Sequence, residues 1–119
     1  MRIIVCGSRD WTDEETIKSF LEAYMGATII HGCCRGADWI AGSIAREMGL
    51  TVLEMPAEWD KYGLAAGPIR NQKMIELNPD VVIAFHGDIN NSKGTKDMVR
   101  RAKENDIPVR IVSGREVFA

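Results

Sequence analysis

The sequence has no long apolar run, few cysteines and almost no net charge, and each shortage excludes a class of protein. The apolar run at the N-terminus stops at Gly7, too early for a secretory signal, and no later run approaches the length of a membrane span. Three cysteines without a Cys-x-x-Cys spacing exclude a disulfide framework and indicate reduced thiols. A formal net charge of −2 does not attract a nucleic-acid backbone. We therefore expect a cytoplasmic protein with no membrane contact, for which nucleic acid is not the expected partner.

Sequence signatures of cofactors and metals are missing as well. The glycines of residues 32–36 do not match Gly-x-Gly-x-x-Gly, and no Walker lysine follows them. No pair of His, Asp or Glu residues has zinc-like spacing, and the adjacent Cys33 and Cys34 are poorly placed to ligate one metal together. His31 and His86 end apolar runs, where we expect structural histidines. The sequence predicts neither a metal nor a cofactor.

The chain does contain enough apolar material for one folded domain. Of its 119 residues, 45% are hydrophobic and 27% are charged, which is the composition of a globular protein. A chain of this length buries roughly 65% of its unfolded surface and needs no metal or disulfide to fold. We expect residues 1–119 to form a single domain, because either half alone would lack a core.

Apolar and amphipathic segments alternate from end to end. Predicted strands cover residues 3–6, 27–31, 50–55, 81–85 and 109–112, and predicted helices cover residues 13–24, 37–48, 69–77 and 94–105. Thr12 is the expected N-cap of the first helix, and Gly49 ends the second. Continuous apolar runs indicate strands buried on both faces, as in a parallel sheet. The pattern predicts an α/β fold, a three-layer, Rossmann-like, doubly wound sheet of about five parallel strands.

Glycine-rich loops follow the predicted strands, and the carboxyl ends of the strands form the ligand-binding edge of a doubly wound sheet. Unpaired N–H groups at helix N-termini favour an anion there, and glycine allows its oxygens to approach the backbone. Arginines add bidentate hydrogen bonds, and Asp38 is placed to accept from a ribose hydroxyl or a base amino group. The candidate ligand-binding residues are Gly7, Ser8, Arg9, Gly32, Arg35, Gly36, Asp38, Arg70, Gly94 and Thr95.

Each of these loops also has a purely structural interpretation. A glycine after a strand commonly serves turn geometry alone, Arg9 and Arg35 fit surface ion pairs, and Gly94-Thr95 fits a simple helix start. The convergence of several loops on one edge favours the ligand site. Residues 56–68 are irregular and aromatic, and their Trp59 and Tyr62 fit a dimer contact and base stacking equally well.

Four blocks of the sequence resemble the SLOG superfamily, and more narrowly its YspA/YpsA-related branch of small bacterial and phage proteins. The blocks are residues 3–9, 31–38, 67–74 and 94–95, so the resemblance extends over nearly the whole chain. It implies a Rossmann-like fold that binds a nucleotide or nucleotide-derived ligand, and it adds Asn71 to the candidate ligand-binding residues. Relatives commonly pair through helices, which implies a homo-oligomer, with a dimer as the expected form.

The best-understood enzymes of the superfamily, the LOG phosphoribohydrolases, provide the comparison for activity. Their arginine four positions before a methionine matches Arg70 and Met74. Their Pro-Gly-Gly-x-Gly-Thr-x-x-Glu motif places the catalytic glutamate at Met98, while Asp97 lies about 100° round the helix. The resemblance therefore implies phosphate binding at Gly94-Thr95, without the glutamate that hydrolysis uses.

Ligand binding without turnover is the function that these features favour. The first alternative is a phosphoribohydrolase or related N-glycosidase, with Arg70 in the site and Asp97 or Asp38 as the acid/base group. The second alternative is an accessory protein of nucleic-acid processing, and the pI of about 5.7 argues against it.

Overall fold

The computed structural model describes residues 1–113 and arranges their five strands in one parallel sheet. The strands are β1 (Arg2–Gly7), β2 (Thr28–His31), β3 (Thr51–Glu54), β4 (Val81–Phe85) and β5 (Val109–Val112). Their order across the sheet is β3-β2-β1-β4-β5. The chain winds outward from β1 through β2 to β3, and then crosses to the other side of β1 for β4 and β5.

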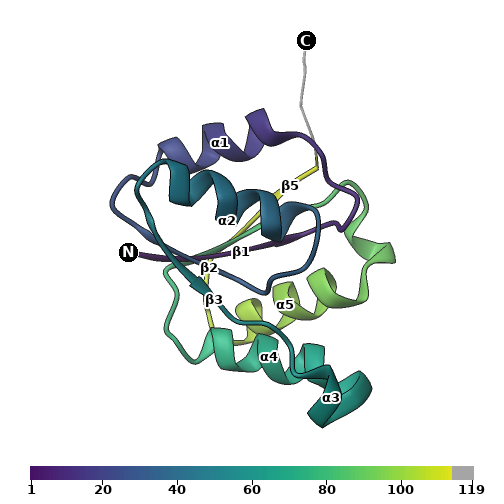
Figure 1. Cartoon of the computed structure of the whole chain (residues 1–119). Helices are drawn as coiled ribbons and strands as arrows, with labels where there is room; N and C mark the ends of the chain where they lie inside the picture. The colour runs from purple at the N-terminus through teal and green to yellow at the C-terminus, as the bar shows by residue number, and fades with distance from the viewer. Residues whose placement is uncertain (114–119) are drawn as a thin grey trace.

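Helices cover both faces of the sheet and give three layers (Figure 1). On one face lie α1 (Glu14–Glu22) and α2 (Ala37–Glu47). On the other lie α4 (Ala66–Ile75) and α5 (Lys93–Glu104), with the short α3 (Trp59–Tyr62) before α4. Two 3₁₀ turns complete the elements, η1 (Gly63–Ala65) and η2 (Ile89–Asn91). Within residues 1–113, no helix has the length and apolar character that crossing a membrane requires.

Alternate residues of β1 point to opposite faces of the sheet and enter two separate apolar cores. Ile3 and Val5 pack in the core under α1 and α2, while Ile4 packs in the core over α4 and α5. Phe85 of β4 is fully buried in the first core and contacts two aromatic rings. Full burial of one such side chain contributes roughly 1.5–3 kcal/mol, so these cores hold the three layers together.

The architecture confirms the predicted three-layer Rossmann-like sheet, with a correction at its edges. All of β4 and the middle of β1 are buried, as the apolar runs predict. The edge strands β3 and β5 are largely exposed, and Leu53 and Ile111 keep 41% and 48% of their surface. An edge strand has a neighbour on one side only, and the helices do not reach over it completely. The prediction of burial on both faces is therefore wrong for these two strands.

Helix boundaries differ from the predicted ones for local reasons. Asp13, and not Thr12, caps α1, because its carboxylate accepts a hydrogen bond from the amide three residues on. α4 begins at Ala66, ahead of the predicted start, since Pro68 fits the first turn of a helix, where no amide donor is needed. Gly49 follows the end of α2 as predicted, with a φ of 81° that favours glycine.

The strand order creates a crevice at one edge of the sheet. β1 and β4 are neighbours, and Gly7 at the end of β1 is in register with Phe85 at the end of β4. The connections after these two strands leave in opposite directions, and ligands of doubly wound sheets bind at such a reversal. The loops that follow β1, β2 and β4 therefore meet at this edge.

Candidate functional site

A cavity of about 550 Å³ lies at the carboxyl ends of β1 and β4, where the strand order reverses. Its volume is within the range of small-molecule sites. Nine candidate ligand-binding residues line it, namely Gly7, Ser8, Arg9, Gly32, Asp38, Arg70, Asn71, Gly94 and Thr95. The other two, Arg35 and Gly36, are not among the described residues that line it. The fold thus brings most of the candidate residues to one place.

The N-terminus of α5 presents backbone amides to this cavity. The helix begins at Lys93, one residue earlier than predicted, and the Oγ of its N-cap Ser92 accepts from the Thr95 amide at 3.1 Å. The amides of Lys93 and Gly94 lie in the same first turn and have no acceptor within the helix. A Cβ built on Gly94 meets no atom within 4 Å. Gly94 is exposed, and its Cβ position is open at the end of the helix where the dipole is positive.

The other three glycines of the candidate site are required by close packing. A Cβ on Gly7 would lie 2.2 Å from the Phe85 carbonyl oxygen, and one on Gly36 would lie 2.3 Å from the Ser8 oxygen. A Cβ on Gly32 would lie 2.2 Å from Nη1 of Arg70. These distances are far below van der Waals contact, so the three glycines let the loops approach one another. The structural interpretation therefore applies to them, even though Gly7 and Gly32 also line the cavity.

Arg70 ties the ends of two strands to α4. Its Nη1 donates to the carbonyl oxygens of Gly32 at 2.8 Å and Met55 at 3.3 Å, and its Nε donates to the Asn71 side chain at 3.0 Å. The side chain is half-buried and lines the cavity. Arg70 therefore builds the wall of the site and contributes a positive charge to it.

A buried polar network joins α4 to α5 beside the cavity. Asn71 is 5% exposed, and its Nδ2 donates to Asp97 at 3.0 Å and to the Gly94 carbonyl at 3.3 Å. The Asp97 carboxylate also accepts from Arg100 and Arg101, each at 2.8 Å. Burial favours a higher pKa for Asp97, but the hydrogen bonds from Arg101, Asn71 and Arg100 outweigh it and lower the pKa. Asp97 is therefore held as an ionised carboxylate.

Asp97 borders the cavity, although it lies about 100° round the helix from Met98. Its hydrogen bond to Asn71 places it against a candidate ligand-binding residue. Met98, at the position of the glutamate in the LOG motif, is 1% exposed and packs in the core over α4 and α5. The carboxylate nearest this position is thus Asp97, with its oxygens already engaged by three donor atoms.

Asp38 is the most buried carboxyl group of the cavity wall, with 5% of its surface exposed. Burial raises its pKa to about 6, although the amide of Gly32, at 3.0 Å from Oδ2, and the charge of Arg70 oppose the shift. The group organises the loop after β2 through that hydrogen bond. The residue also lines the cavity, as the sequence predicts.

The two exposed arginines of the candidate set lie in different places. Arg9 lines the cavity and adds its charge near Asp38, on which it acts to lower the pKa. Arg35 is 77% exposed, and its Nη2 lies 3.7 Å from the Asp10 carboxylate. Such a pair contributes little to stability, since water screens it. The surface ion pair expected as the alternative for Arg35 is thus present.

The two aromatic residues of the segment before α4 lie in different places. Trp59 is half-exposed, lines the cavity and lies against Gly67 of α4. Tyr62 lies beside a separate hollow, with the amino groups of Lys61 and Lys73 at 5.1 and 5.9 Å from its ring centre. Trp59 and Lys93 line the cavity and were not among the candidate ligand-binding residues. The aromatic character of residues 56–68 was the available signal for Trp59.

A parallel sheet of this order with a cavity at its reversal point defines the Rossmann-like class of α/β proteins. A model of the YspA, cpYpsA-related SLOG family matches residues 1–62. The chain belongs to this family, which confirms the resemblance found in the sequence. It is also 35% identical over 118 residues to the Gene 61 protein of Mycobacterium phage D29, a match that covers 91% of this chain and 93% of that protein.

Two solved structures share the fold at low sequence identity. DNA processing protein A (DprA) from Streptococcus pneumoniae matches with a TM-score of 0.78 and 17% identity over 98% of this chain. This chain spans 51% of DprA, about half its length. The protein TM1055 matches with a TM-score of 0.66 and 18% identity, over 91% of this chain and 71% of TM1055. At these identities the likeness shows the fold.

Proposed function

We propose that this protein binds a nucleotide or nucleotide-derived ligand in the cavity, with a phosphate at the N-terminus of α5. The observation that carries the proposal is the open space beside Gly94, where an added Cβ would touch no neighbouring atom. Among the described helices, only the first turn of α5 has a glycine that both lines the cavity and leaves such a space. The amides of Lys93 and Gly94 donate to the phosphate, and the helix dipole adds to the attraction. Arg9 and Lys93 bring positive side chains to the same cavity.

The rest of the cavity offers groups for a ribose and a base. Asp38 accepts a hydrogen bond from a ribose hydroxyl or a base amino group, and Arg70 fixes the wall beside it. Trp59 at the cavity edge provides a ring face for base stacking, which contributes about 1–3 kcal/mol per base in single-stranded nucleic-acid complexes. These contacts favour a nucleoside phosphate over a free inorganic anion.

The site supports binding without turnover better than hydrolysis. An N-glycosidic cleavage needs a group that gives or takes a proton near the anomeric carbon, and Met98 can do neither. Asp97 is ionised and held by Arg100, Arg101 and Asn71, so it is a poor proton donor at neutral pH. The phosphoribohydrolase remains the alternative that an activity assay distinguishes.

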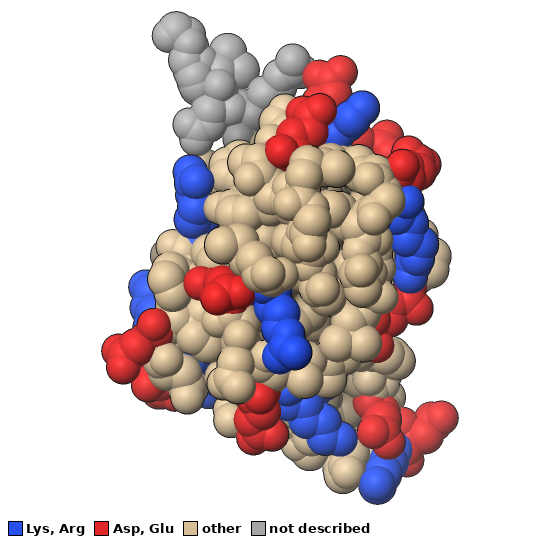
Figure 2. Space-filling view, turned by 90° about the vertical axis from the view of Figure 1, so that its left-hand side faces the viewer, with Lys and Arg blue, Asp and Glu red and all other residues tan. Residues whose placement is uncertain are grey.

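Nucleic-acid processing is the weaker alternative. DprA, named for DNA processing, shares the fold with this chain. The face at the amino ends of the strands carries Lys/Arg and Asp/Glu side chains next to one another around an uncharged area, and neither sign gathers into a patch there (Figure 2). The net charge of −2 also favours a small ligand.

We further propose a cytoplasmic, single-domain protein that associates as a homodimer. Leu64, which is 95% exposed, and Trp59, which is 49% exposed, lie in the segment 59–65 next to the cavity. An exposed apolar pair beside a site suits contact with a second copy. In this arrangement the partner would cover the mouth of the cavity.

Native mass spectrometry of freshly purified protein tests these proposals together. We expect a bound mass in the range of a nucleotide that is lost on unfolding, and a dimer as the main species. Isothermal titration of the stripped protein with AMP, ADP-ribose and cyclic nucleotides then identifies the ligand class. Protein without bound mass that gives no heat with any of these compounds would contradict the proposed function.

A further inference from the structure

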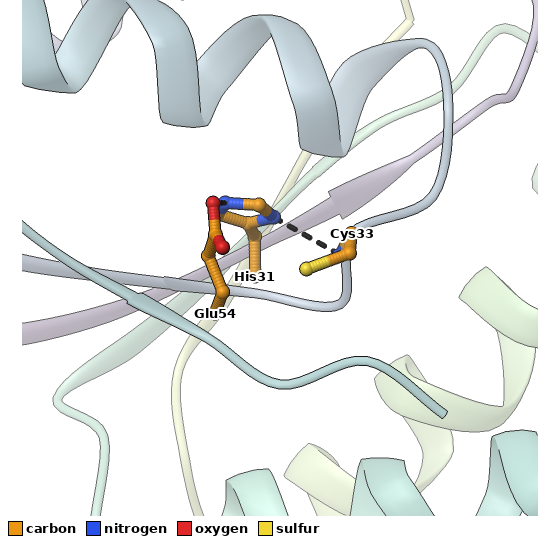
Figure 3. Close-up of side chains that lie close together, drawn as sticks. All are labelled: His31, Cys33 and Glu54. Atoms are coloured by element: carbon orange, nitrogen blue, oxygen red, sulfur yellow. Dashed lines mark hydrogen bonds and ion pairs between the residues drawn. The ribbon is translucent and has the colours of Figure 1, made fainter. Parts of the chain in front are cut away.

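Three side chains with metal-binding atoms lie together at the ends of β2 and β3, apart from the nucleotide cavity. They are His31, Cys33 and Glu54, and one ligand atom from each lies within 4.8 Å of the other two (Figure 3). His31 and Glu54 are register partners in the parallel pair β2–β3, so the sheet itself holds them side by side. Cys33 follows two residues after His31 and is a free thiol. None of the three lines the cavity described above.

The His31 ring is fully buried with one nitrogen unpaired. Its Nδ1 accepts from the Cys33 amide at 3.0 Å, so the proton of the neutral ring lies on Nε2. Among the described residues, Nε2 is the buried side-chain polar atom without a hydrogen-bond partner. Oε2 of Glu54 lies 3.9 Å from Nε2, beyond hydrogen-bond distance.

Helix α2 approaches the His31 ring closely, at a glycine. Gly42 packs over the His31 ring, and a Cβ there would lie 2.5 Å from Nε2. A buried polar atom without a partner is uncommon in native proteins, and an ion is one of the recognised explanations. A bound ion is consistent with the groups around Nε2, which are Gly42, the Glu54 carboxylate and the Cys33 thiol.

We propose that Nε2 of His31, Sγ of Cys33 and the carboxylate of Glu54 bind one divalent transition-metal ion, with Zn²⁺ as the best fit. Nitrogen, thiolate and carboxylate are the donor types that Zn²⁺ takes, at about 2.0–2.3 Å. A thiolate and a carboxylate neutralise the two charges of the ion. A water or other small ligand from solvent completes the tetrahedron, since Glu54 keeps 39% of its side chain exposed.

Metal binding requires defined local adjustments. The Cys33 thiol releases its proton to solvent, and the His31 proton moves by exchange from Nε2 to Nδ1, so the net release is one proton. The Cys33 amide must then turn away from Nδ1. Cys33 has a φ of 63°, a region that residues other than glycine rarely adopt, and we expect its peptide to make that turn. Glu54 also accepts from Arg46, and its exposed carboxylate can rotate toward the ion while keeping one oxygen for the arginine.

The proposed metal site is connected to the nucleotide cavity by one loop. Cys33 lies between Gly32 and Cys34, and both of these line the cavity. An ion at Cys33 would fix this loop to β3 through Glu54. The metal site does not depend on the proposed nucleotide, because no residue is shared between them.

Titration of the reduced, metal-stripped full chain with Co²⁺ tests the proposal, because a thiolate bound to Co²⁺ gives an intense near-ultraviolet charge-transfer band. We expect this band in the wild type with one equivalent of Co²⁺, and its displacement by Zn²⁺. Cys33→Ser should abolish the band, whereas Cys34→Ser, the matched control at the adjacent thiol, should keep it. Glu54→Gln, at a half-exposed side chain that tolerates substitution, should keep the fold and weaken Co²⁺ binding by about tenfold or more.

Thermal unfolding gives a second readout on the same proteins. Zn²⁺ should raise the melting temperature of the wild type and of Cys34→Ser, and should leave that of Cys33→Ser unchanged. Absence of the band from the folded wild type would overturn the proposal. A band that persists in Cys33→Ser, or that disappears in Cys34→Ser alone, would also overturn it, because the thiolate ligand would then be a different cysteine.

Discussion

At the scale of single residues, the glycines around the cavity differ in what occupies the space that their missing side chain leaves. Gly32 leaves space that Arg70 fills, since a Cβ there would lie 2.2 Å from Nη1. Gly94 leaves space that no described atom within 4 Å fills. The first glycine makes room for the Arg70 side chain, and we propose that the second leaves an opening for a ligand. Sequence alone does not separate these roles, because both residues follow a strand and precede or begin a helix.

Alanine at these two positions should therefore have opposite effects on stability. Gly32→Ala forces Arg70 to move and should lower the free energy of unfolding by about 1–3 kcal/mol, as overpacking does. Gly94→Ala, inside the first turn of α5, should be neutral or stabilise by up to about 1 kcal/mol from helix propensity. Urea denaturation of both variants measures the difference. Equal destabilisation by both would mean that the space before Gly94 is not open.

Asp38 gives a residue-scale prediction on pH. Its pKa rises from 3.8 to about 6 on folding, so between about pH 4 and pH 6 the folded protein holds a proton that the unfolded chain has released. Folding stability is therefore lost as the pH rises through this window, by about 3 kcal/mol at most. Asp38→Asn can still accept from the Gly32 amide and has no charge to bury.

Comparing the wild type with Asp38→Asn isolates the contribution of the Asp38 carboxyl group to the pH dependence of stability. The free energy of unfolding of Asp38→Asn, relative to wild type, should increase as the pH rises from about 4 to about 7, since only the wild type loses this contribution. Denaturation at several pH values measures it. A difference that stays constant over this range would contradict the assigned burial of the charge.

At the scale of elements, most of the strands and helices follow from the apolar pattern. The predicted strands 81–85 and 109–112 coincide with β4 and β5. β4 is a continuous apolar run, and β5 is a β-branched segment interrupted only by Arg110. The helix starts were less predictable. Asp13 and Thr12 are both good N-cap types, and only the backbone decides which side chain reaches the free amides.

The N-cap of α1 can be checked directly. Asp13→Ala removes the acceptor for the amide of Thr16 and should lower the free energy of unfolding by about 1 kcal/mol. Thr12→Ala, at the exposed neighbour, should change it by less than about 0.5 kcal/mol. Chemical denaturation of the pair is the measurement, and a larger loss from Thr12→Ala would restore the cap that the sequence predicts.

Contacts between distant elements explain what the sequence did not reveal about the site. The pairing of His31 with Glu54 arises from the register of β2 and β3, and the contact between Asn71 and Asp97 arises from the packing of α4 on α5. Neither pair has a diagnostic spacing along the chain. The loops after β1 and β2 were predictable as part of the site because their position follows from the topology.

At the scale of the whole molecule, we propose a binding site whose carboxylate nearest the LOG glutamate position, Asp97, is already held by hydrogen bonds. AMP incubated with the protein should release no adenine above a control without protein over several hours, as followed by chromatography. General acid–base catalysis commonly contributes about 10²–10⁴-fold, and the ionised, hydrogen-bonded Asp97 does not supply the acid. Adenine release that disappears in Asp97→Asn would instead identify a phosphoribohydrolase.

The central claim is that a nucleotide phosphate binds at the N-terminus of α5, and calorimetric titration of three proteins tests it most directly. Gly94→Val fills the open space, whereas Lys96→Val changes the same helix at an exposed residue outside the cavity. We predict that the wild type and Lys96→Val bind at least one of AMP and ADP-ribose. Gly94→Val should keep the melting temperature of the wild type and bind about ten- to a hundredfold more weakly. This is the effect expected when charged hydrogen bonds to one phosphate are lost. Equal affinity of Gly94→Val and the wild type would contradict the account.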